Sequence, residues 1–139
     1  MTPSRFLHNE SLIADFRAHA GQVGSGPFAG RPLLLLTTTG ARSRKPHVTP
    51  LVYTRDGDRW TVVASKGGAP SHPSLYHNLV ANPEVTVEVG ADTLRARAKV
   101  AAGAERQRLW DQHAGTHAAF KGYEQRTSRV IPVVVLEKV

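Results

Sequence analysis

Residues 33–51 read LLLLTTTGARSRKPHVTPL, and this stretch decides the fold. Its first seven residues are four apolar leucines followed by three β-branched threonines, and a second run of apolar and β-branched residues extends over 48–54. Gly40 opens the short polar connection between the two runs. Runs of this length separated by a turn predict two sequential antiparallel strands, 33–39 and 48–54.

Further strands are predicted on the C-terminal side of this pair. Asp56-Gly57 is a typical hairpin turn and leads into a strand over 59–65. Two more strands, joined at Gly90, and a β-branched C-terminal strand with Pro132 near its start or on an unpaired edge complete the set. The sequence therefore predicts six strands, over 33–39, 48–54, 59–65, 84–89, 93–100 and 130–139.

Helical segments flank these strands. Apolar residues recur at spacings of three and four over 11–23, which predicts an amphipathic N-terminal helix ended by Gly24. A short helix over 71–81 and another over 104–117 follow, with a turn or short helix over 118–126. Six antiparallel strands with peripheral helices indicate a mainly β, α+β fold that forms a closed or nearly closed antiparallel barrel.

Composition limits the classes of protein that remain. A chain of 139 residues with 40% hydrophobic and 21% charged residues predicts one soluble domain over 1–139. It contains no cysteine, which excludes disulfides and a thiol nucleophile. The apolar runs are too short to span a bilayer, and the N-terminus lacks a secretory signal, so we expect a cytoplasmic protein. The amphipathic first helix leaves open a peripheral membrane contact.

The charge of the chain favours an anionic partner. Lys and Arg number 18 against 11 acidic residues, a formal net charge of +7. Three cations, Arg42, Arg44 and Lys45, gather within the connection after Gly40, where backbone N–H groups and side chains could form an anion site. A solvated basic hairpin is an equally good interpretation of this loop alone. A second Gly-rich turn, over 64–68 ahead of a predicted helix, adds weight to the anion site.

Other chemistries find less support in the sequence. His113 and His117 have the i,i+4 spacing of metal ligands but lack a third ligand, so they are predicted to be structural or surface residues and no metal is expected. Neither a Gly-x-Ser-x-Gly elbow nor a Walker loop occurs. Nucleic-acid binding is the main rival, but aromatics form only 6% of the chain and do not alternate with the cations. A discrete polyanion matches the loop better than nucleic acid does.

Three sequence blocks carry a resemblance to a known family. They are 36–51, then 65–68 continuing to 76–79 and Asn82-Pro83, and finally Tyr123 followed by 129–132. In this order and spacing they resemble the deazaflavin (F420)-dependent nitroreductase family, which has a split β-barrel fold of the FMN-binding-like superfamily. The resemblance covers nearly all of the chain after Pro32 and implies a six-stranded antiparallel split β-barrel.

The resemblance implies a cofactor and a site. The cofactor is coenzyme F420, an 8-hydroxy-5-deazaflavin with a phosphate-linked oligoglutamate tail, whose anionic tail would explain the basic loop. Two positions depart from the family pattern, because Arg44 stands where the family often has Gly and His47 where it often has Arg. The implied contacts to phosphate or tail are Arg42, Ser43, Arg44, Lys45 and His47, and those to the ring are Thr49, Pro50, Leu51, Ala64, Ser65, Lys66 and Gly67, with Tyr76, Asn78 and Leu79 nearby.

The resemblance also implies a reaction. The chain would be an F420H2-dependent reductase that transfers a hydride to a quinone, nitroaromatic or enone, with Ser65 or Tyr123 polarising the acceptor and solvent or Tyr123 providing a proton. Phe120 and Arg126 replace tyrosines of better-known members. The alternatives are a non-catalytic F420 carrier and an FMN-binding oxidoreductase of the same fold. A homodimer is left open.

Overall fold

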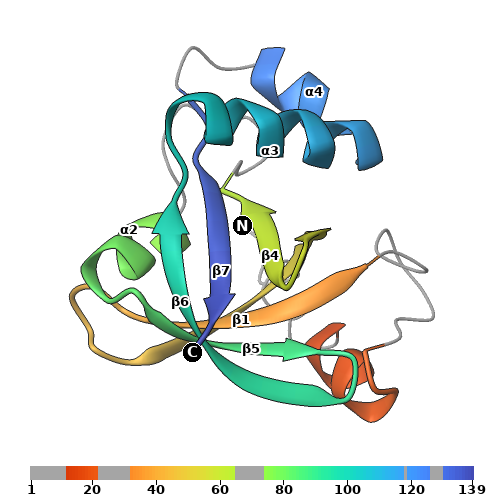
Figure 1. Cartoon of the computed structure of the whole chain (residues 1–139). Coiled ribbons are helices and arrows are strands. Elements are labelled where there is room, and N and C mark those ends of the chain that lie inside the picture. The colour runs from red at the N-terminus through yellow and green to blue at the C-terminus, as the bar shows by residue number, and fades with distance from the viewer. Residues whose placement is uncertain (1–11, 22–31, 65–73, 118, 126–129) are drawn as a thin grey trace, which may run out of the picture.

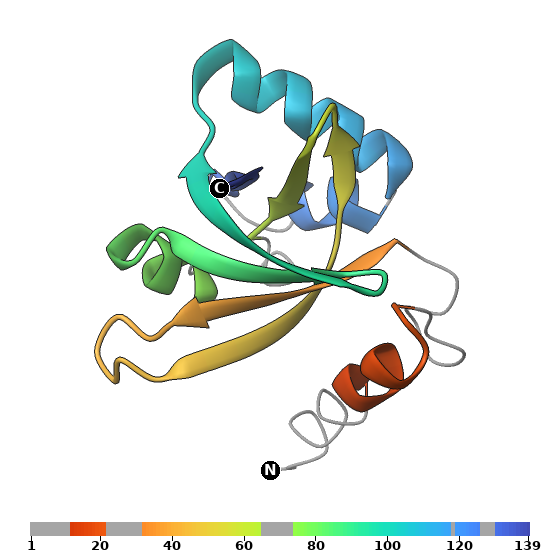
Figure 2. The same cartoon turned by 60° about the horizontal axis from the view of Figure 1, so that its bottom comes forward.

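The structure is a computed structural model that describes residues 12–21, 32–64, 74–117, 119–125 and 130–139. The described residues form one seven-stranded antiparallel sheet, which curls into a half-barrel with helices at its periphery (Figures 1 and 2). The sheet order is β2-β1-β5-β6-β7-β4-β3. The elements are β1 Leu33–Thr39, β2 Pro46–Val52, β3 Thr54–Asp56, β4 Arg59–Val63, α2 Ser74–Ala81, β5 Glu84–Val89, β6 Asp92–Val100, α3 Gly103–Thr116, α4 Ala119–Gln125 and β7 Val133–Lys138.

The prediction of six strands is wrong because the strand expected over 48–54 is divided at Tyr53. Before this residue, β2 pairs with β1, and Val52 faces Leu33 at the end of the ladder. The Tyr53 N–H donates to the Pro32 carbonyl at 3.2 Å, and from Thr54 onward the chain pairs with β4 instead. One continuous extended segment therefore supplies both edges of the sheet, which explains why the sheet curls.

The other strands agree closely with the predicted ranges. Asp56 pairs with Arg59 across a two-residue turn in which Gly57 has φ +65°, a conformation that favours glycine. The C-terminal strand begins later than predicted, at Val133, because Pro132 has no N–H to give to a ladder. Pro46 and Pro50 lie on β2. This is an edge strand, and it tolerates proline because a missing N–H on its unpaired side breaks no bond of the sheet.

The sheet is buried on both of its faces. In β1, Leu33 and Leu35 face one side while Leu34 and Leu36 face the other, and each is at most 3% exposed. This alternation divides the core into two clusters. The first core cluster lies under α3 and the N-terminal helix and includes Leu12, Phe16, Leu33, Leu35, Leu109 and Trp110; the second includes Leu34, Leu36, Leu75, Leu79, Val134 and Leu136, with α2 packed on it.

The N-terminal helix is shorter than predicted. Residues 12–18 are helical and residues 19–21 form a turn, so the helix does not extend to Val23. Ala20 and Gly21 have φ +53° and +90°, and the Gly21 N–H donates to the Phe16 carbonyl at 2.9 Å. This bond from the sixth residue back to the first is the Schellman ending of a helix. The sequence does not indicate this ending, because Ala rarely adopts the left-handed conformation.

The apolar face of this helix packs against the protein. Leu12 and Phe16 are 6% and 2% exposed within the first core cluster. Arg17 holds the other side of the helix to Glu88 of β5 through two hydrogen bonds of 2.9 and 2.8 Å. The face that suggested membrane contact is thus occupied by the core. Among the described residues, no helix has the length and apolar character needed to cross a bilayer.

Candidate functional site

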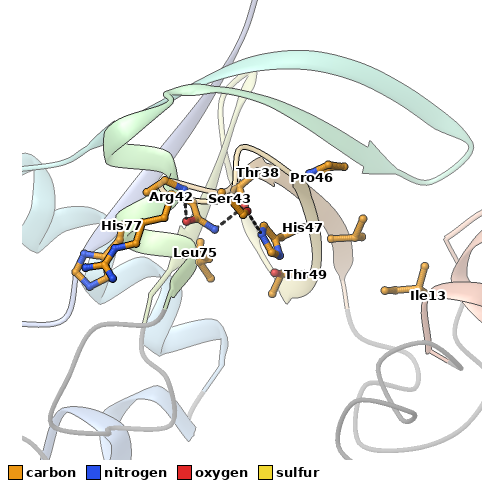
Figure 3. Close-up of a pocket in the computed structure, with 13 residues that line it drawn as sticks. Ile13, Thr38, Arg42, Ser43, Pro46, His47, Thr49, Leu75 and His77 are labelled. Atoms are coloured by element: carbon orange, nitrogen blue, oxygen red, sulfur yellow. Dashed lines mark hydrogen bonds between the residues drawn. The ribbon is translucent and has the colours of Figure 1, made fainter.

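A cavity of about 1010 Å³ opens where the β1–β2 connection, α2 and the helix over 12–18 approach one another (Figure 3). One end is polar and the other, next to Ile13, is apolar (Figure 3). None of the described residues that line it is acidic. The lining residues are Ile13, Thr38, Gly40, Ala41, Arg42, Ser43, Pro46, His47, Val48, Thr49, Leu75, His77 and Asn78.

The basic connection over 40–45 is a folded turn. Gly40 N–H donates to the Lys45 carbonyl at 2.8 Å, and Arg44 N–H donates to the Gly40 carbonyl at 3.1 Å. Lys45 N–H donates to Ser43 Oγ at 3.2 Å, and Ala41 N–H donates to Asn78 Oδ1 at 3.0 Å. Four of the backbone amides of the loop are thus used within the protein. An anion at this loop would therefore be bound mainly by side chains. Fewer backbone N–H groups are available to it than the sequence predicts.

Arg44 adopts a conformation that suits glycine, the residue often found there in the family that the sequence resembles. Its φ is +62°, which costs an L-residue about 1–2 kcal/mol. We expect Arg44→Gly to stabilise the protein by about 0.5–1 kcal/mol, because relief of strain exceeds the added entropy of the unfolded chain. Urea unfolding measures this change. Arg42→Gly in the same loop is the control and should destabilise, because Arg42 has no positive φ to relieve.

Asn78 joins α2 to the basic loop from a buried position. It is 8% exposed, and its two amide atoms contact the loop and β1. Asn78 Oδ1 accepts from Ala41 N–H, and Nδ2 donates to Thr38 Oγ1 at 3.5 Å (Figure 3). Asn82 adds a second link, from Nδ2 to the Thr39 carbonyl at 3.4 Å. The side chains of α2 therefore fix the position of the loop that carries the cations.

Removal of this link should loosen both the fold and the loop. We expect Asn78→Ala to lower the free energy of unfolding by about 1–3 kcal/mol, because Thr38, only 1% exposed, loses a hydrogen-bond partner. Chemical denaturation provides the measurement. Asn82→Ala should cost less, since Asn82 is half-buried and its side chain makes one such bond, whereas the side chain of buried Asn78 makes two. An equal loss in the two variants would contradict a special role for Asn78.

The cations of the loop differ in their surroundings from those on other faces. Several exposed arginines elsewhere pair with carboxylates, as Arg17 does with Glu88 at 2.8 Å, whereas exposed Arg55 donates to the Gly57 carbonyl. Within the described part of the chain, Arg42, Arg44 and Lys45 take part in no ion pair. Only Arg42 of these three lines the cavity. An unpaired guanidinium at a cavity without acidic groups is suited to binding a phosphate or carboxylate.

The structure brings together part of the predicted site. Five of the predicted cofactor contacts line the cavity: Arg42, Ser43, His47, Thr49 and Asn78. Seven others are described but do not line it: Arg44, Lys45, Pro50, Leu51, Ala64, Tyr76 and Leu79. Ser65, Lys66 and Gly67 lie outside the described residues, as does the side chain of Tyr123, although its backbone belongs to α4.

Several lining residues were not predicted. Thr38 faces His47 across the β1–β2 ladder. The register of this hairpin therefore places Thr38 beside the site. His77 lies between two predicted residues of α2, Tyr76 and Asn78, and lines the cavity from an exposed position. Ile13 comes from the N-terminal helix, and no feature of the sequence indicates that this helix approaches the loop.

His113 and His117 are buried under α3, as structural histidines. His113 is 0% exposed, and its Nδ1 lies 3.2 Å from Thr54 Oγ1. His117 is 4% exposed, with Nε2 at 3.1 Å from the Tyr53 carbonyl. The two rings lie 4.8 Å apart, and Phe120 of α4 packs edge-on against His113. The pair thus holds α3 to the point where β2 becomes β3.

Comparison with known proteins identifies the family of the chain. The model of the family described as F420H(2)-dependent quinone reductase matches residues 11–138. The chain is 43% identical over 128 residues to the F420H(2)-dependent quinone reductase Rv1261c of Mycobacterium tuberculosis. The aligned region covers 90% of this chain and 86% of that protein.

Two solved structures are similar to the chain along most of its length. One is an F420-H2 dependent reductase, FDR-A, with 40% identity and a TM-score of 0.72 over 77% of this chain and 95% of that one. The other is described as a domain-swapped dimer, with 33% identity and a TM-score of 0.74 over 98% and 100% of the two chains. The chain therefore belongs to the family of F420H(2)-dependent quinone reductases, which are F420-dependent oxidoreductases.

Proposed function

We propose that this chain binds reduced F420 in the cavity beside the basic loop and passes its hydride to a quinone-type acceptor. The family supports the cofactor and the reaction class. The observation that carries the placement is the position of Arg42, which has no ion-pair partner among the described residues, at the polar end of a cavity of about 1010 Å³ whose described lining contains no acidic residue. Such a volume lies at the upper end for small-molecule sites, which suits a bulky cofactor.

The residues at the polar end fit an anionic tail. Arg42 offers a guanidinium fork, and Ser43 and His47 offer a hydroxyl and a ring nitrogen on the same side of the loop (Figure 3). Arg44 and Lys45 add positive charge nearby without lining the cavity. In this proposal the phosphate and the glutamate carboxylates lie at Arg42, with weaker support from the other two cations.

The ring of the cofactor is assigned to the strand side of the cavity. Thr49 of β2 lines it, and Leu51 lies on the same face two residues further along the edge strand. Pro50, Ala64 and Leu79 are buried, so in this proposal they support the ring site from behind. Ser65, Lys66, Gly67 and Tyr76 remain predicted contacts. This placement corresponds to the split-barrel arrangement implied by the sequence resemblance.

The chemistry requires little acid–base machinery from the protein. When bound, reduced F420 supplies a hydride; one hydride and one proton together convert a quinone to a hydroquinone. The protein binds both partners, orients them and limits access of water. Ser65 and Tyr123 are the proposed groups that polarise the acceptor, and Tyr123 or solvent delivers the proton. Nitroaromatics and enones are proposed as further acceptors because they too are electron-poor.

The role of Tyr123 has a direct test. Tyr123→Phe removes one hydroxyl and keeps the ring, so kcat with a quinone should fall by about tenfold or more if this hydroxyl polarises or protonates the acceptor. The binding constant for F420 should stay unchanged, which separates the acceptor step from cofactor binding. Steady-state turnover beside an F420 titration gives both values. Unchanged turnover would remove Tyr123 from the mechanism.

Titration with F420, followed by its fluorescence, tests the proposal as a whole. We expect saturable binding of F420 that a large excess of FMN does not displace, and oxidation of reduced F420 when a quinone is added. Binding of F420 without turnover across a panel of quinones, nitroaromatics and enones would favour the non-catalytic carrier. Displacement by FMN, or purification with a bound yellow flavin, would favour the FMN-binding oxidoreductase.

A homodimer is proposed from one comparison. The chain is 33% identical to a protein whose structure is described as a domain-swapped dimer, and the similarity covers 98% of this chain. Sedimentation equilibrium at several protein concentrations distinguishes a dimer from a monomer. A monomer at all concentrations would contradict this proposal and would leave the cofactor assignment intact.

A further inference from the structure

Ser43 and His47 meet directly above Gly40 at the polar end of the cavity. Ser43 Oγ lies 3.4 Å from His47 Nε2 and also accepts the Lys45 N–H at 3.2 Å (Figure 3). A Cβ atom at Gly40 would collide with Ser43 Oγ and lie 2.9 Å from His47 Nε2. The absence of a side chain at Gly40 therefore lets Ser43 and His47 approach each other here, and a larger residue would force these two side chains to shift.

The hydroxyl of Ser43 can serve only one acceptor at a time. A serine hydroxyl has one proton and two lone pairs, and the Lys45 N–H already occupies a lone pair. When His47 Nε2 carries no proton, the Ser43 O–H can donate to the ring. When Nε2 is protonated, the ring donates to Ser43 and the hydroxyl proton is released for another acceptor. At 3.4 Å the contact is weak, so its polarity reverses at little cost.

Protonation of His47 thus changes two properties of the cavity together. A positive charge arises at the ring, and the Ser43 hydroxyl becomes available as a donor. Both changes favour the binding of an anion in the cavity. The neutral ring in its Nε2–H tautomer frees the same hydroxyl but supplies no charge, so the full effect requires uptake of a proton.

The other charged groups around His47 do not repeat this effect. Arg42 of the same loop lines the cavity and keeps its charge at all pH values used in practice. From α2, His77 is the titratable group that lines the cavity, and the helix over 12–18 contributes only Ile13. From β1 the neighbour across the ladder is Thr38, which is uncharged. Arg44 and Lys45 lie on the loop outside the lining.

We propose that His47 couples anion binding in this cavity to proton uptake, with Ser43 as the positioning residue that transmits the change. The expected ligand is a linear chain that carries several phosphodiester or carboxylate groups. The inference rests on the proposed assignment of the F420 tail to this cavity. Lower pH strengthens binding, and each anion bound near neutral pH takes up a fraction of a proton.

Calorimetry with two anions that do not titrate near neutral pH tests this proposal. The probes are inorganic sulfate and N-acetylated triglutamate, each titrated at pH 6 and pH 8, and at pH 6.5 in two buffers of different ionisation enthalpy. We expect affinity roughly three- to tenfold higher at pH 6, about the contribution of one charge-assisted contact. The difference in heat between the two buffers should report proton uptake. Binding that is equal at both pH values, without uptake, would overturn the proposal.

Matched variants assign the effect to one residue. His47→Gln should bind at both pH values with the weaker affinity of the wild type at pH 8, and His47→Arg should bind tightly at both. Ser43→Ala should keep proton uptake and lose part of the gain in affinity. His77→Gln replaces the other histidine of the lining; loss of the pH dependence in this variant, with its retention in His47→Gln, would overturn the assignment to His47. Melting curves at both pH values establish that each variant is folded.

The outcome for F420 itself is a separate measurement. Failure of the wild type to bind F420 at any pH would overturn the proposed function, whatever the anion probes show. Tight binding of F420 with no dependence on pH and no proton uptake would overturn only the inference about His47. The two failures are therefore distinguishable.

Discussion

Arg42→Ala is expected to weaken F420 binding by about tenfold to a hundredfold, because a hydrogen bond between charged groups contributes about 1.5–3 kcal/mol. Arg42 lines the cavity, and within the described residues it has no carboxylate partner that would compete for it. Fluorescence titration of F420 measures the change in Kd. Because Arg42 is exposed and has no partner of this kind to lose, the stability of the protein should stay nearly unchanged.

Arg44→Ala and Lys45→Ala are the matched controls for this effect. Both residues lie in the same loop and carry the same charge as Arg42, but neither lines the cavity. Each should weaken binding by about threefold or less at physiological salt, since exposed charges act through a screened field. High salt should reduce these small effects further. If all three substitutions weaken binding equally, the loop acts as a diffuse basic patch, and the specific position of Arg42 has no role.

Most of the sheet could be predicted from local sequence alone. The apolar run at 33–36 and the turn at 56–57 act over a few residues, and the structure confirms the strand and the hairpin that they predict. The division at Tyr53 could not be predicted, because it depends on where β1 begins and on which strand comes next in the ladder. Such information is non-local, and six strands were predicted for that reason.

The candidate site could be predicted only where it lies within one segment. The three cations lie within four residues of the sequence, so the basic loop is predictable. The direction of each side chain depends on the turn that is fixed by Asn78 and by the carbonyls of the loop. This turn separates Arg42 from Arg44 and Lys45 at the cavity. The contribution of Ile13 depends on how the N-terminal helix packs, which involves a salt bridge from Arg17 to Glu88 that no local pattern indicates.

His113 is expected to make the stability of the protein depend on pH. Burial, and to a smaller extent the positive charge of a protonated His117 nearby, lower the pKa of His113 from 6.5 to about 4. In the structure Nδ1 contacts Thr54, while Nε2 is buried and has no hydrogen-bond partner among the described residues. A second proton on the ring would therefore create a buried positive charge, and its Nε2–H would have no partner to stabilise it.

The direction follows from proton binding in the two states. Below pH 6.5 the unfolded chain binds a proton at His113, whereas the folded protein does not bind it until about pH 4. The free energy of unfolding therefore decreases as the pH decreases from 6.5 to 4. The loss should reach about 2 kcal/mol at pH 5 and about 3 kcal/mol at pH 4. Above pH 7.5 the contribution should be constant. Urea unfolding at intervals between pH 8 and pH 5 measures the slope.

Two variants separate His113 from the other titrating groups. His113→Gln keeps a polar side chain beside Thr54 and should lose most of the slope between pH 7 and pH 5, even if it is less stable throughout. His77→Gln, at an exposed position, should keep it. Asp56 does not interfere, because hydrogen bonds from Arg108 and Arg59 lower its pKa to about 2, and its contribution is lost only below pH 4. A slope that survives in His113→Gln would mean that the buried ring is not the group that resists protonation.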